Sequence, residues 1–211
     1  MKIIALRDAG LPDTRHFLDQ MFALRAKIFG ERLGWDVNTD EDRERDRFDD
    51  LKPTYVLALT KHDEVVGSAR MLPATGPTML SSIFPELLVG AEYTPHAHMV
   101  ESSRFCVDTT VEGSKNAGLH QVTRFMFAGI LEWCLSSGHN EVVTVTDVAV
   151  ERILSRAGWP LRRFGPPQTI GETIALAGLL DVNFEIFARV KPLEYASDFR
   201  AYRGSKPSAA I

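Results

Sequence analysis

Residues 98–107 constrain the fold of this chain most, because they combine the pattern of a buried strand with two charged side chains. Val100 and Phe105 belong to an apolar run that is typical of a buried strand, yet Glu101 and Arg104 lie within it. Burying a carboxylate or a guanidinium without a partner costs several kcal/mol or more. The segment therefore indicates a strand that borders a polar cleft, although an edge strand with one solvated face would produce the same pattern.

Side chains alternate along a strand, and this alternation places Glu101 and Ser103 on one face and Ser102 and Arg104 on the other. Two arrangements follow. Either the two charges serve opposite faces of the sheet, or a β-bulge turns one of them, as bulges beside active sites often do.

The length and composition of the chain indicate one compact domain. With 211 residues and 45% hydrophobic content, we expect a single domain over residues 1–203 and a disordered tail over 204–211. The net charge of −4 argues against general affinity for nucleic acid. Cys106 and Cys134 lie in apolar patterns, which favours buried thiols in a reducing compartment. No segment resembles a signal peptide or a membrane span, so we expect a cytoplasmic protein that does not bind membranes. We also expect a monomer.

Hydrophobic periodicity predicts a mixed sheet with helices on both faces. The connection over 73–98 is expected to be a loop with a short helical piece near 82–88. We expect strands at 2–7, 55–60, 64–71, 98–107, 141–145, 168–174 and 183–188, and helices at 13–34, 116–137 and 148–157, followed by a short C-terminal helix.

Residues 36–53, here called the acidic lid, are dense in charges of both signs and poor in apolar groups. By default such a segment is a solvated, mobile loop, and its length is typical of lids and binding loops. Phe48 lies between Asp46 and Asp49, so it could anchor a docked turn whose carboxylates face a cation. Arg25 lies on an apolar helix stripe, where it either extends to solvent or points into a pocket.

Short motifs extend this pattern along most of the chain. They are Arg25-x-x-Ile-Phe29, Trp35, Asp46-Arg-Phe-Asp49, Gly67-x-x-Arg70-x-Leu-Pro, Met79-Leu80, Phe84 and Glu101-x-Ser103-Arg104-Phe105. Each motif alone has little specificity, but their joint order is specific. In these motifs the chain resembles the acyl-homoserine lactone synthases, which make the autoinducers of bacterial quorum sensing.

The resemblance implies both a fold and a reaction. The fold is α/β, a three-layer α/β/α sandwich with a mixed sheet that is splayed to form an acyl tunnel, as in the N-acetyltransferases. In the implied reaction, the amine of S-adenosylmethionine takes an acyl group from a thioester on acyl carrier protein. Its carboxylate then closes the lactone and releases methylthioadenosine. S-adenosylmethionine is a substrate here, so the resemblance implies no cofactor and no metal.

The resemblance also assigns roles to residues. S-adenosylmethionine carries a sulfonium, an ammonium and a carboxylate, which suit acids, aromatic faces and an arginine fork. Glu101 is the candidate general base, because partial burial would raise its pKa. Alternatively, Glu101 is a structural partner of an arginine, and the acids only fasten the lid in a salt-bridge network. The catalytic set is Glu101, Ser103 and Arg104, and the S-adenosylmethionine set is Arg25, Phe29, Trp35, Asp46, Asp49, Arg70 and Phe105.

Two further sets concern the acyl donor. Thr146 takes the position where the family uses a hydroxyl residue with 3-oxo or 3-hydroxy chains, although a β-branched residue also suits any strand. A lysine of some members is replaced here by Thr169, which would weaken or shift carrier-protein docking. The candidate acyl-chain residues are Met79, Phe84, Met126, Thr144, Thr146, Leu154, Leu176 and Phe184. The candidate docking residues are Arg152, Arg156, Arg162 and Arg163, which would otherwise form a solvated face.

Other functions fit parts of the pattern. An acyl-CoA-dependent N-acyltransferase of the same fold would cradle a pyrophosphate on a glycine-rich loop, and residues 112–120 are a poor version of such a loop. A synthase that uses acyl-CoA, and a non-catalytic sensor that uses the same cleft, are the remaining alternatives.

Overall fold

The computed structural model describes residues 1–7, 14–32, 39–40, 42–111, 115–116 and 119–199. Trp35, the tail expected at 204–211 and part of the glycine-containing stretch at 112–120 therefore lie outside the described residues. The described part of the chain contains no helix with the length and apolar character needed to cross a membrane.

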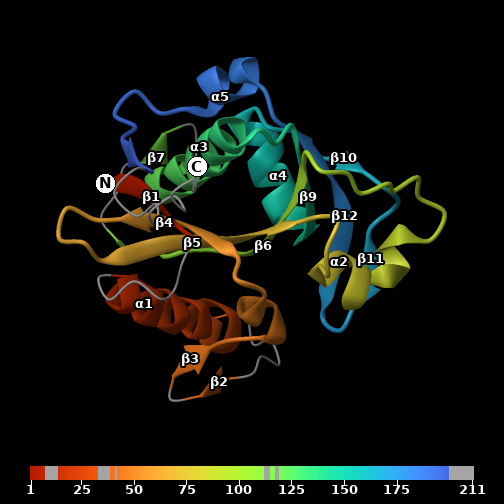
Figure 1. Cartoon of the computed structure of the whole chain (residues 1–211), viewed down its shortest axis with the longest axis horizontal. Coiled ribbons are helices and arrows are strands. Elements are labelled where there is room, and N and C mark those ends of the chain that lie inside the picture. The colour runs from red at the N-terminus through yellow and green to blue at the C-terminus, as the bar shows by residue number, and fades with distance from the viewer. Residues whose placement is uncertain (8–13, 33–38, 41, 112–114, 117–118, 200–211) are drawn as a thin grey trace, which may run out of the picture.

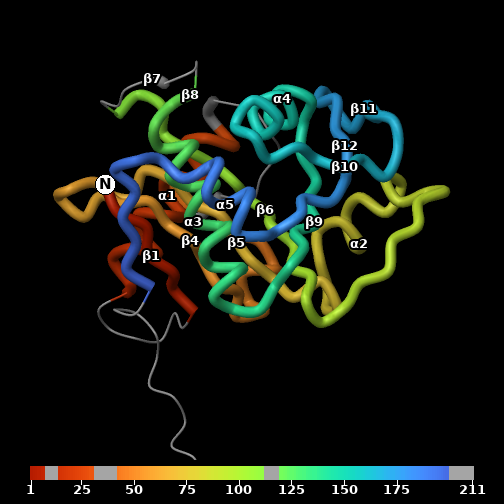
Figure 2. Tube along the Cα trace, turned by 90° about the horizontal axis from the view of Figure 1, so that it is seen from above, coloured from red at the N-terminus to blue at the C-terminus, as the bar shows by residue number. Residues whose placement is uncertain are grey.

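A mixed sheet of nine strands forms the centre of the molecule (Figure 1). Its order is β10-β12-β9-β6-β5-β4-β1-β13, with β11 paired to β12. Figure 2 shows β10, β11 and β12 at the end of the sheet opposite the N-terminus. The strands are β1 Lys2–Leu6, β4 Thr54–Leu59, β5 Val65–Pro73, β6 Met99–Val107, β9 Glu141–Asp147, β10 Arg162–Arg163, β11 Gln168–Ile170, β12 Thr173–Asp181 and β13 Ser197–Asp198. Two small ribbons pair β2 Thr39–Asp40 with β3 Arg43–Glu44, and β7 Lys115–Asn116 with β8 Leu119–His120.

Helices cover both faces of the sheet, which gives the three layers expected from the sequence (Figure 1). On one face, α1 Arg15–Arg25 continues into a π-helix at Ala26–Arg32 and packs on alternate side chains of β1 and β4. On the other face, α3 Gln121–Ser137 and α4 Val148–Ala157 cover the opposite set of side chains. The remaining helices are short: the 3-10 turns Arg47–Leu51 and Pro85–Leu88, α2 Met79–Ser82 and α5 Phe184–Val190.

The predicted elements near the C-terminus are partly wrong. The strand expected at 183–188 is instead helix α5, because the side chain of Asn183 caps it by accepting from the Ile186 N–H at 2.9 Å. The strand expected at 168–174 is divided by a turn at Gly171, where φ is +58°, and β12 follows. The short terminal helix expected after 188 is not found up to residue 199; β13 is there instead.

The strand at 98–107 contains a β-bulge, which decides between the two arrangements considered above. Ser68 pairs with Cys106 and Arg70 pairs with Ser103, so two residues of β6 oppose one residue of β5. Arg104, the first of these two, has a φ of +52°. This conformation is rare for a residue with a side chain, and it changes the direction of the Arg104 side chain relative to simple alternation.

The sheet splits between β6 and β9. These parallel strands pair only from Met99 with Glu141 to Glu101 with Val143. Beyond this point the Thr144 hydroxyl donates to the Ser102 carbonyl at 2.8 Å. The splayed sheet that the resemblance implies is therefore confirmed, and its opening lies at the centre of β6.

Candidate active site

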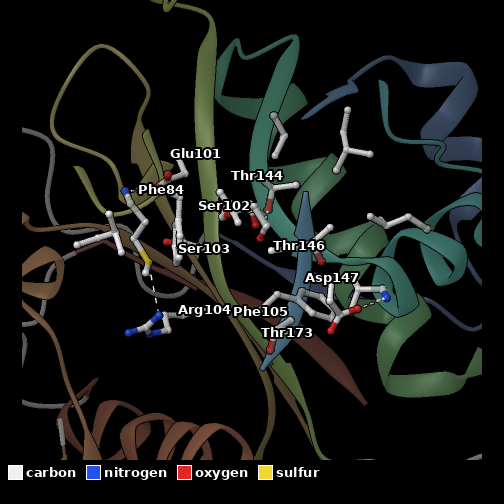
Figure 3. A pocket seen from close by; sticks show the side chains of 18 of the residues that line it. Phe84, Glu101, Ser102, Ser103, Arg104, Phe105, Thr144, Thr146, Asp147 and Thr173 are labelled. Atoms are coloured by element: carbon white, nitrogen blue, oxygen red, sulfur yellow. Dashed lines mark hydrogen bonds between the residues drawn. The ribbon is translucent and has the colours of Figure 1, made fainter. Parts of the chain in front are cut away.

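A cavity of about 780 Å³ occupies the place where β6 and β9 separate. Ser102 and Ser103 follow one another on β6, and both line the cavity, so it passes through the sheet. Figure 3 shows Glu101 and Ser103 on one side of β6 and Ser102 on the side that faces Thr144. The inner arm, between the sheet and helices α3 and α4, is lined by Phe127, Ile130, Val142, Leu154, Trp159 and Leu180. The outer arm, on the side of α2, is lined by Met79, Phe84, Ile170 and Ala175.

A buried network of charges lies beside the opening of the sheet. Its members, here called the charged network, are Arg25, Arg70, Arg104, Glu44, Asp46 and Asp49. Three cations face three carboxylates, so the network is neutral as a whole. This balance allows the charges to be buried, because each charge has a partner at hydrogen-bonding distance.

Arg25 is fully buried and uses its whole guanidinium within the network. Its Nη1 and Nη2 donate to the two carboxylate oxygens of Asp49 at 2.9 and 3.0 Å, and its Nε donates to Glu44. The Tyr55 hydroxyl donates to the same Asp49 carboxylate at 2.7 Å. Of the two possibilities for Arg25, extension to solvent is therefore wrong: its head lies in a polar pocket inside the protein.

Arg70 and Arg104 connect the network to the cavity. Arg70 donates to Asp46 and Asp49, and its Nε donates to the Ser103 hydroxyl at 3.1 Å. Arg104 donates to Glu44 at 3.1 Å and pairs with Asp46 at 3.0 Å. Arg104 lines the cavity directly, so it is the cation of the network that a bound molecule would meet first.

Each arginine of the network also has an aromatic neighbour, which adds a cation–π contact. The guanidinium carbons of Arg25, Arg70 and Arg104 lie 5.3, 5.4 and 5.5 Å from the ring centroids of Phe22, Phe48 and Phe29, respectively. Phe29 comes from the π-helix and lines the cavity. An aromatic face and a cation are thus exposed to the cavity side by side.

The network perturbs the acidity of its central carboxylate. Burial opposes the ionisation of Asp49, but hydrogen bonds and charge from Arg25, together with the charge of Arg70, outweigh it. The pKa of Asp49 is therefore held well below its ordinary range. Asp49 remains an anion at neutral pH, which makes it a fixed holder of arginines and a poor proton acceptor.

The acidic lid is docked where the structure describes it. Phe48 is 3% exposed and Asp49 8%, and Asp46 and Asp49 form a reciprocal capping box around the 3-10 turn. The expectation of a solvated loop is therefore wrong for this turn, and Phe48 anchors it as the alternative described; the mobility of the lid stays a prediction. The docked turn is stabilised because the Asp49 and Asp46 carboxylates pair with Arg25 and Arg70.

Glu44 belongs to the network but was missed in the sequence analysis. It is fully buried and binds both Arg25 and Arg104. It stands in the most highly charged stretch of the chain, where acids are normally solvated. Only its position two residues before Asp46, on the same side of an extended segment, could have suggested a buried role.

Glu101 lines the cavity, yet its carboxylate has two fixed partners. One oxygen accepts from the Met79 N–H at 2.9 Å and the other from the Leu80 N–H at 2.7 Å. Burial raises the pKa of Glu101, and these two bonds and the charge of Arg70 only partly offset it. The partners expected from the structural alternative were arginine side chains; the structure instead provides backbone groups at the start of α2.

The predicted acyl-chain residues separate into two groups. Met79, Phe84, Thr144, Thr146 and Leu154 line the cavity. Met126, Leu176 and Phe184 do not, and for these the prediction is wrong. Ile130 and Leu180, four residues further along α3 and β12, line the inner arm instead.

Each of the three misplaced residues has another environment. Met126 packs beneath Gly67, where its Sδ would lie 3.1 Å from an added Cβ. Leu176 is fully buried, and Phe184 is 76% exposed on α5. Phe105, predicted beside S-adenosylmethionine, stacks on Phe127 at 5.3 Å and therefore belongs with the inner arm.

The four predicted docking arginines are not equivalent. Arg163 makes two hydrogen bonds to Glu151, and Arg162 binds Asp181 and Glu141. Arg152 and Arg156 lie exposed on α4, whose other side carries Leu154 into the cavity. The positive surface that a partner could meet on α4 thus consists of Arg152 and Arg156.

An α/β/α sheet that opens into an apolar arm, with acid, hydroxyl and guanidinium groups at the opening, defines a site of the acyltransferase class. The arm can hold an acyl chain, and the polar groups can hold an acceptor beside it. The chain belongs to the autoinducer synthase family, whose sequence model matches residues 12–190. A probable acyl-homoserine-lactone synthase from Sinorhizobium fredii is 48% identical over 93% of this chain and 95% of its own length. The activity supported for this chain is therefore acyl-homoserine lactone synthesis, an acyl transfer that serves quorum sensing.

Solved structures support the same assignment. The acyl-homoserine lactone synthase LasI is 34% identical, covers 89% of this chain and 93% of its own, and gives a TM-score of 0.78. The CoA-dependent acyl-homoserine lactone synthase BjaI, solved with SAM and isopentyl-CoA, is 25% identical over 94% of this chain and 93% of its own, with a TM-score of 0.81. A putative N-acetyltransferase from Lactobacillus plantarum, 16% identical with a TM-score of 0.58, shares the fold alone.

Proposed function

We propose that this enzyme acylates the amine of S-adenosylmethionine from an acyl-carrier-protein thioester and then closes the homoserine lactone, releasing methylthioadenosine. The observation that carries the proposal is the opening between β6 and β9, where the apolar inner arm meets the polar groups of Glu101, Ser103 and Arg104. An acyl chain and an amine that approach from the two sides would meet at this opening.

The outer side of the opening suits S-adenosylmethionine. Arg104 and Asp46 are the partly exposed members of the charged network, at 13% and 17%, and Phe29 lies beside them. We assign Arg104 to the carboxylate, Asp46 to a positive group and Phe29 to the sulfonium or adenine. Arg25, Asp49 and Arg70 are buried and hold these groups in place; Trp35, which lies outside the described residues, stays a prediction.

The proposed chemistry needs one base and no protein nucleophile. The ammonium loses a proton to Glu101, directly or through a water, and the resulting amine attacks the thioester carbonyl. The carbon–sulfur bond then breaks, the nitrogen gives its second proton to the departing carrier thiolate, and Glu101 returns its proton to solvent. Each carboxylate oxygen of Glu101 keeps a second lone pair beyond its backbone partner. The S-adenosylmethionine carboxylate then attacks the carbon that bears the sulfonium, and methylthioadenosine leaves as a neutral thioether.

Acyl carrier protein is the proposed donor. The exposed Arg152 and Arg156 on α4 would attract an acidic carrier to the helix that borders the inner arm. BjaI is CoA-dependent, so acyl-CoA is the alternative donor. Thr146 lines the cavity and could donate a hydrogen bond to a 3-oxo or 3-hydroxy oxygen, which favours donors of this type.

The test is a reaction with S-adenosylmethionine and matched acyl thioesters of carrier protein and CoA. Release of methylthioadenosine together with lactone supports the synthase, and a higher kcat/KM with carrier protein supports the donor. Thiol release that depends on another amine would indicate an ordinary N-acyltransferase. Binding of S-adenosylmethionine without any turnover would indicate a sensor.

A further inference from the structure

The register of the sheet orders the lining of the inner arm by depth. Val142 pairs with Val100 on β6 and with Leu180 on β12, so these residues lie where the sheet is still closed. Thr146, further along β9, lies where β6 has already separated. From Val142 to Asp147 the arm extends along β9 for roughly 17 Å at the ordinary rise of a strand.

Trp159 lies at the closed end of this arm. It lines the cavity although only 1% of its surface is exposed. Its indole Nε1 donates to the backbone carbonyl of Asp181 at 2.8 Å, directly after Leu180. Its ring meets the edge of Phe127, with centroids 5.9 Å apart and planes at 74°. The indole thus has a polar partner on β12 and an aromatic partner on α3.

The backbone of Trp159 is fixed as well. Helix α4 ends at Gly158, whose φ of +87° reverses the chain, and the Trp159 N–H donates to the Leu154 carbonyl at 3.0 Å. Moving the indole would break its bond to Asp181 and leave the buried indole N–H unpaired, which is costly in an apolar arm. Ile130 and Leu154, the aliphatic neighbours in the arm, carry no such restraint.

We infer that Trp159 is the floor of the inner arm and sets the longest acyl chain that this enzyme accepts. The inference rests on the proposed function, because it takes the inner arm as the site of the acyl chain. An acyl tail that grows toward Val142 and Leu180 gains affinity as each methylene is buried. When the tail reaches the indole, a further methylene has no space, and the gain stops.

A binding experiment tests this without depending on turnover. S-alkyl thioethers of pantetheine with increasing chain length are titrated by calorimetry into the wild type and into Trp159→Phe and Trp159→Leu. In the wild type, Kd should fall roughly fourfold per methylene up to a limiting length and then level off. Both substitutions should move this limit to longer chains, with the larger shift in Trp159→Leu.

Trp159→Phe is the conservative variant: it retains an aromatic ring to pack against Phe127, so it should fold even if Trp159→Leu does not. Trp133→Phe is the matched control: Trp133 is a half-buried tryptophan on α3 that stacks on His139 at 5.4 Å and does not line the cavity. This control should leave the limiting length unchanged. An unchanged limit in both Trp159 variants, or a Kd that does not depend on chain length in the wild type, would overturn the inference.

The same proteins separate this inference from the proposed reaction. One outcome is a limiting chain length that changes in the Trp159 variants while no methylthioadenosine is released from S-adenosylmethionine and acyl carrier protein. That result would support the role of Trp159 as the floor and reject the proposed reaction. Release of methylthioadenosine with an unchanged limiting chain length in the Trp159 variants would reject only the role of Trp159.

Discussion

Glu101 has two tasks at the residue scale, one structural and one proposed. Its carboxylate holds the first two N–H groups of α2, and in the proposed reaction it also accepts a proton from the substrate amine. The tasks are compatible because the bonds to Met79 and Leu80 fix the orientation of the carboxylate while burial keeps its pKa raised. A fixed, basic carboxylate at the opening of the sheet is what a proton acceptor requires.

Replacing Glu101 by Gln separates these tasks. The amide nitrogen must face either the Met79 or the Leu80 N–H, so one of these bonds is lost at a cost of about 1–3 kcal/mol. Turnover should fall by roughly 100-fold or more, because the base is removed. Steady-state kinetics and urea unfolding measure the two effects.

Thr78→Ala is the control for this substitution. The Thr78 side chain caps α2 by accepting from the Ser81 N–H, so its loss weakens the same helix and leaves Glu101 in place. If Thr78→Ala reduced turnover as strongly as Glu101→Gln, Glu101 would act only by holding α2.

The hydroxyl of Thr146 should select the acyl group. Thr146→Val keeps the shape and removes the donor, so preference for 3-oxo over unsubstituted donors should fall roughly 3- to 10-fold, the net value of one hydrogen bond. Competition between the two donors, analysed by mass spectrometry of the lactones, gives the ratio. Thr144→Val is the control and should not lower this preference, because the Thr144 hydroxyl already donates to the Ser102 carbonyl. Equal product ratios in Thr146→Val and the wild type would refute the role of the Thr146 hydroxyl.

Residue types and order predicted much of the site, whereas exact positions depended on packing. Arg25 was singled out by its place on an apolar helix stripe, but that pattern left open whether its head reaches solvent or an internal partner. Met126 and Leu176 were misplaced by four residues, because i and i+4 share a helix or strand face and depth along an element cannot be read from periodicity. Glu44 was hidden by the charged residues around it.

At the scale of elements, the bulge in β6 explains why strand alternation was insufficient. The register change between Ser68 and Arg70 is a property of the β5–β6 pair, so β6 read alone leaves two arrangements open. Likewise, the short apolar run after Asn183 suits a strand as well as a helix, and the helix is chosen by its cap and its packing on α3. The long elements, such as α3 and β5, were predicted because their patterns persist for several turns or alternations.

The docked acidic lid should depend on Glu44. Glu44→Ala leaves the buried Arg25 and the partly exposed Arg104 without one carboxylate, which should lower the free energy of unfolding by about 3–5 kcal/mol and increase proteolysis within the lid. Asp50→Ala is the control in the same segment, since its pair with Arg45 is exposed on both sides and should contribute less than about 1 kcal/mol. Similar losses in both variants would argue against the network as the holder of the lid.

At the scale of the whole molecule, the charged network makes stability depend on pH. The folded-state pKa of Asp49 lies below its unfolded value, so Asp49 contributes stability that is present above the unfolded pKa near 4 and is lost as pH falls through the folded pKa. Glu101 has the opposite sign: its raised pKa makes its ionisation oppose folding as pH rises above the ordinary glutamate value. Urea unfolding between pH 7 and pH 3 should show the wild type losing stability more steeply than Asp49→Asn. Parallel curves would contradict the role of Asp49.

The surface of α4 should control how the carrier protein binds. Arg152→Glu and Arg156→Glu should each raise KM for acyl carrier protein roughly fivefold, about 1 kcal/mol for an exposed pair, and leave kcat and the rate with acyl-pantetheine unchanged. Lys61→Glu makes the same change in net charge on the exposed β4–β5 turn and should have no effect. Equal effects of all three substitutions would indicate general electrostatics and not docking.

The cavity divides the chain at the end of β6. Every member of the charged network precedes residue 108, whereas the residues that line the inner arm follow it, apart from Phe105, which stacks on Phe127. Under the proposed function, the first half of the sequence provides the groups that bind and react with S-adenosylmethionine, and the second half provides most of the acyl-chain pocket. Substitutions in the second half can thus change which signal molecule a bacterium releases, while the reaction that produces it stays the same.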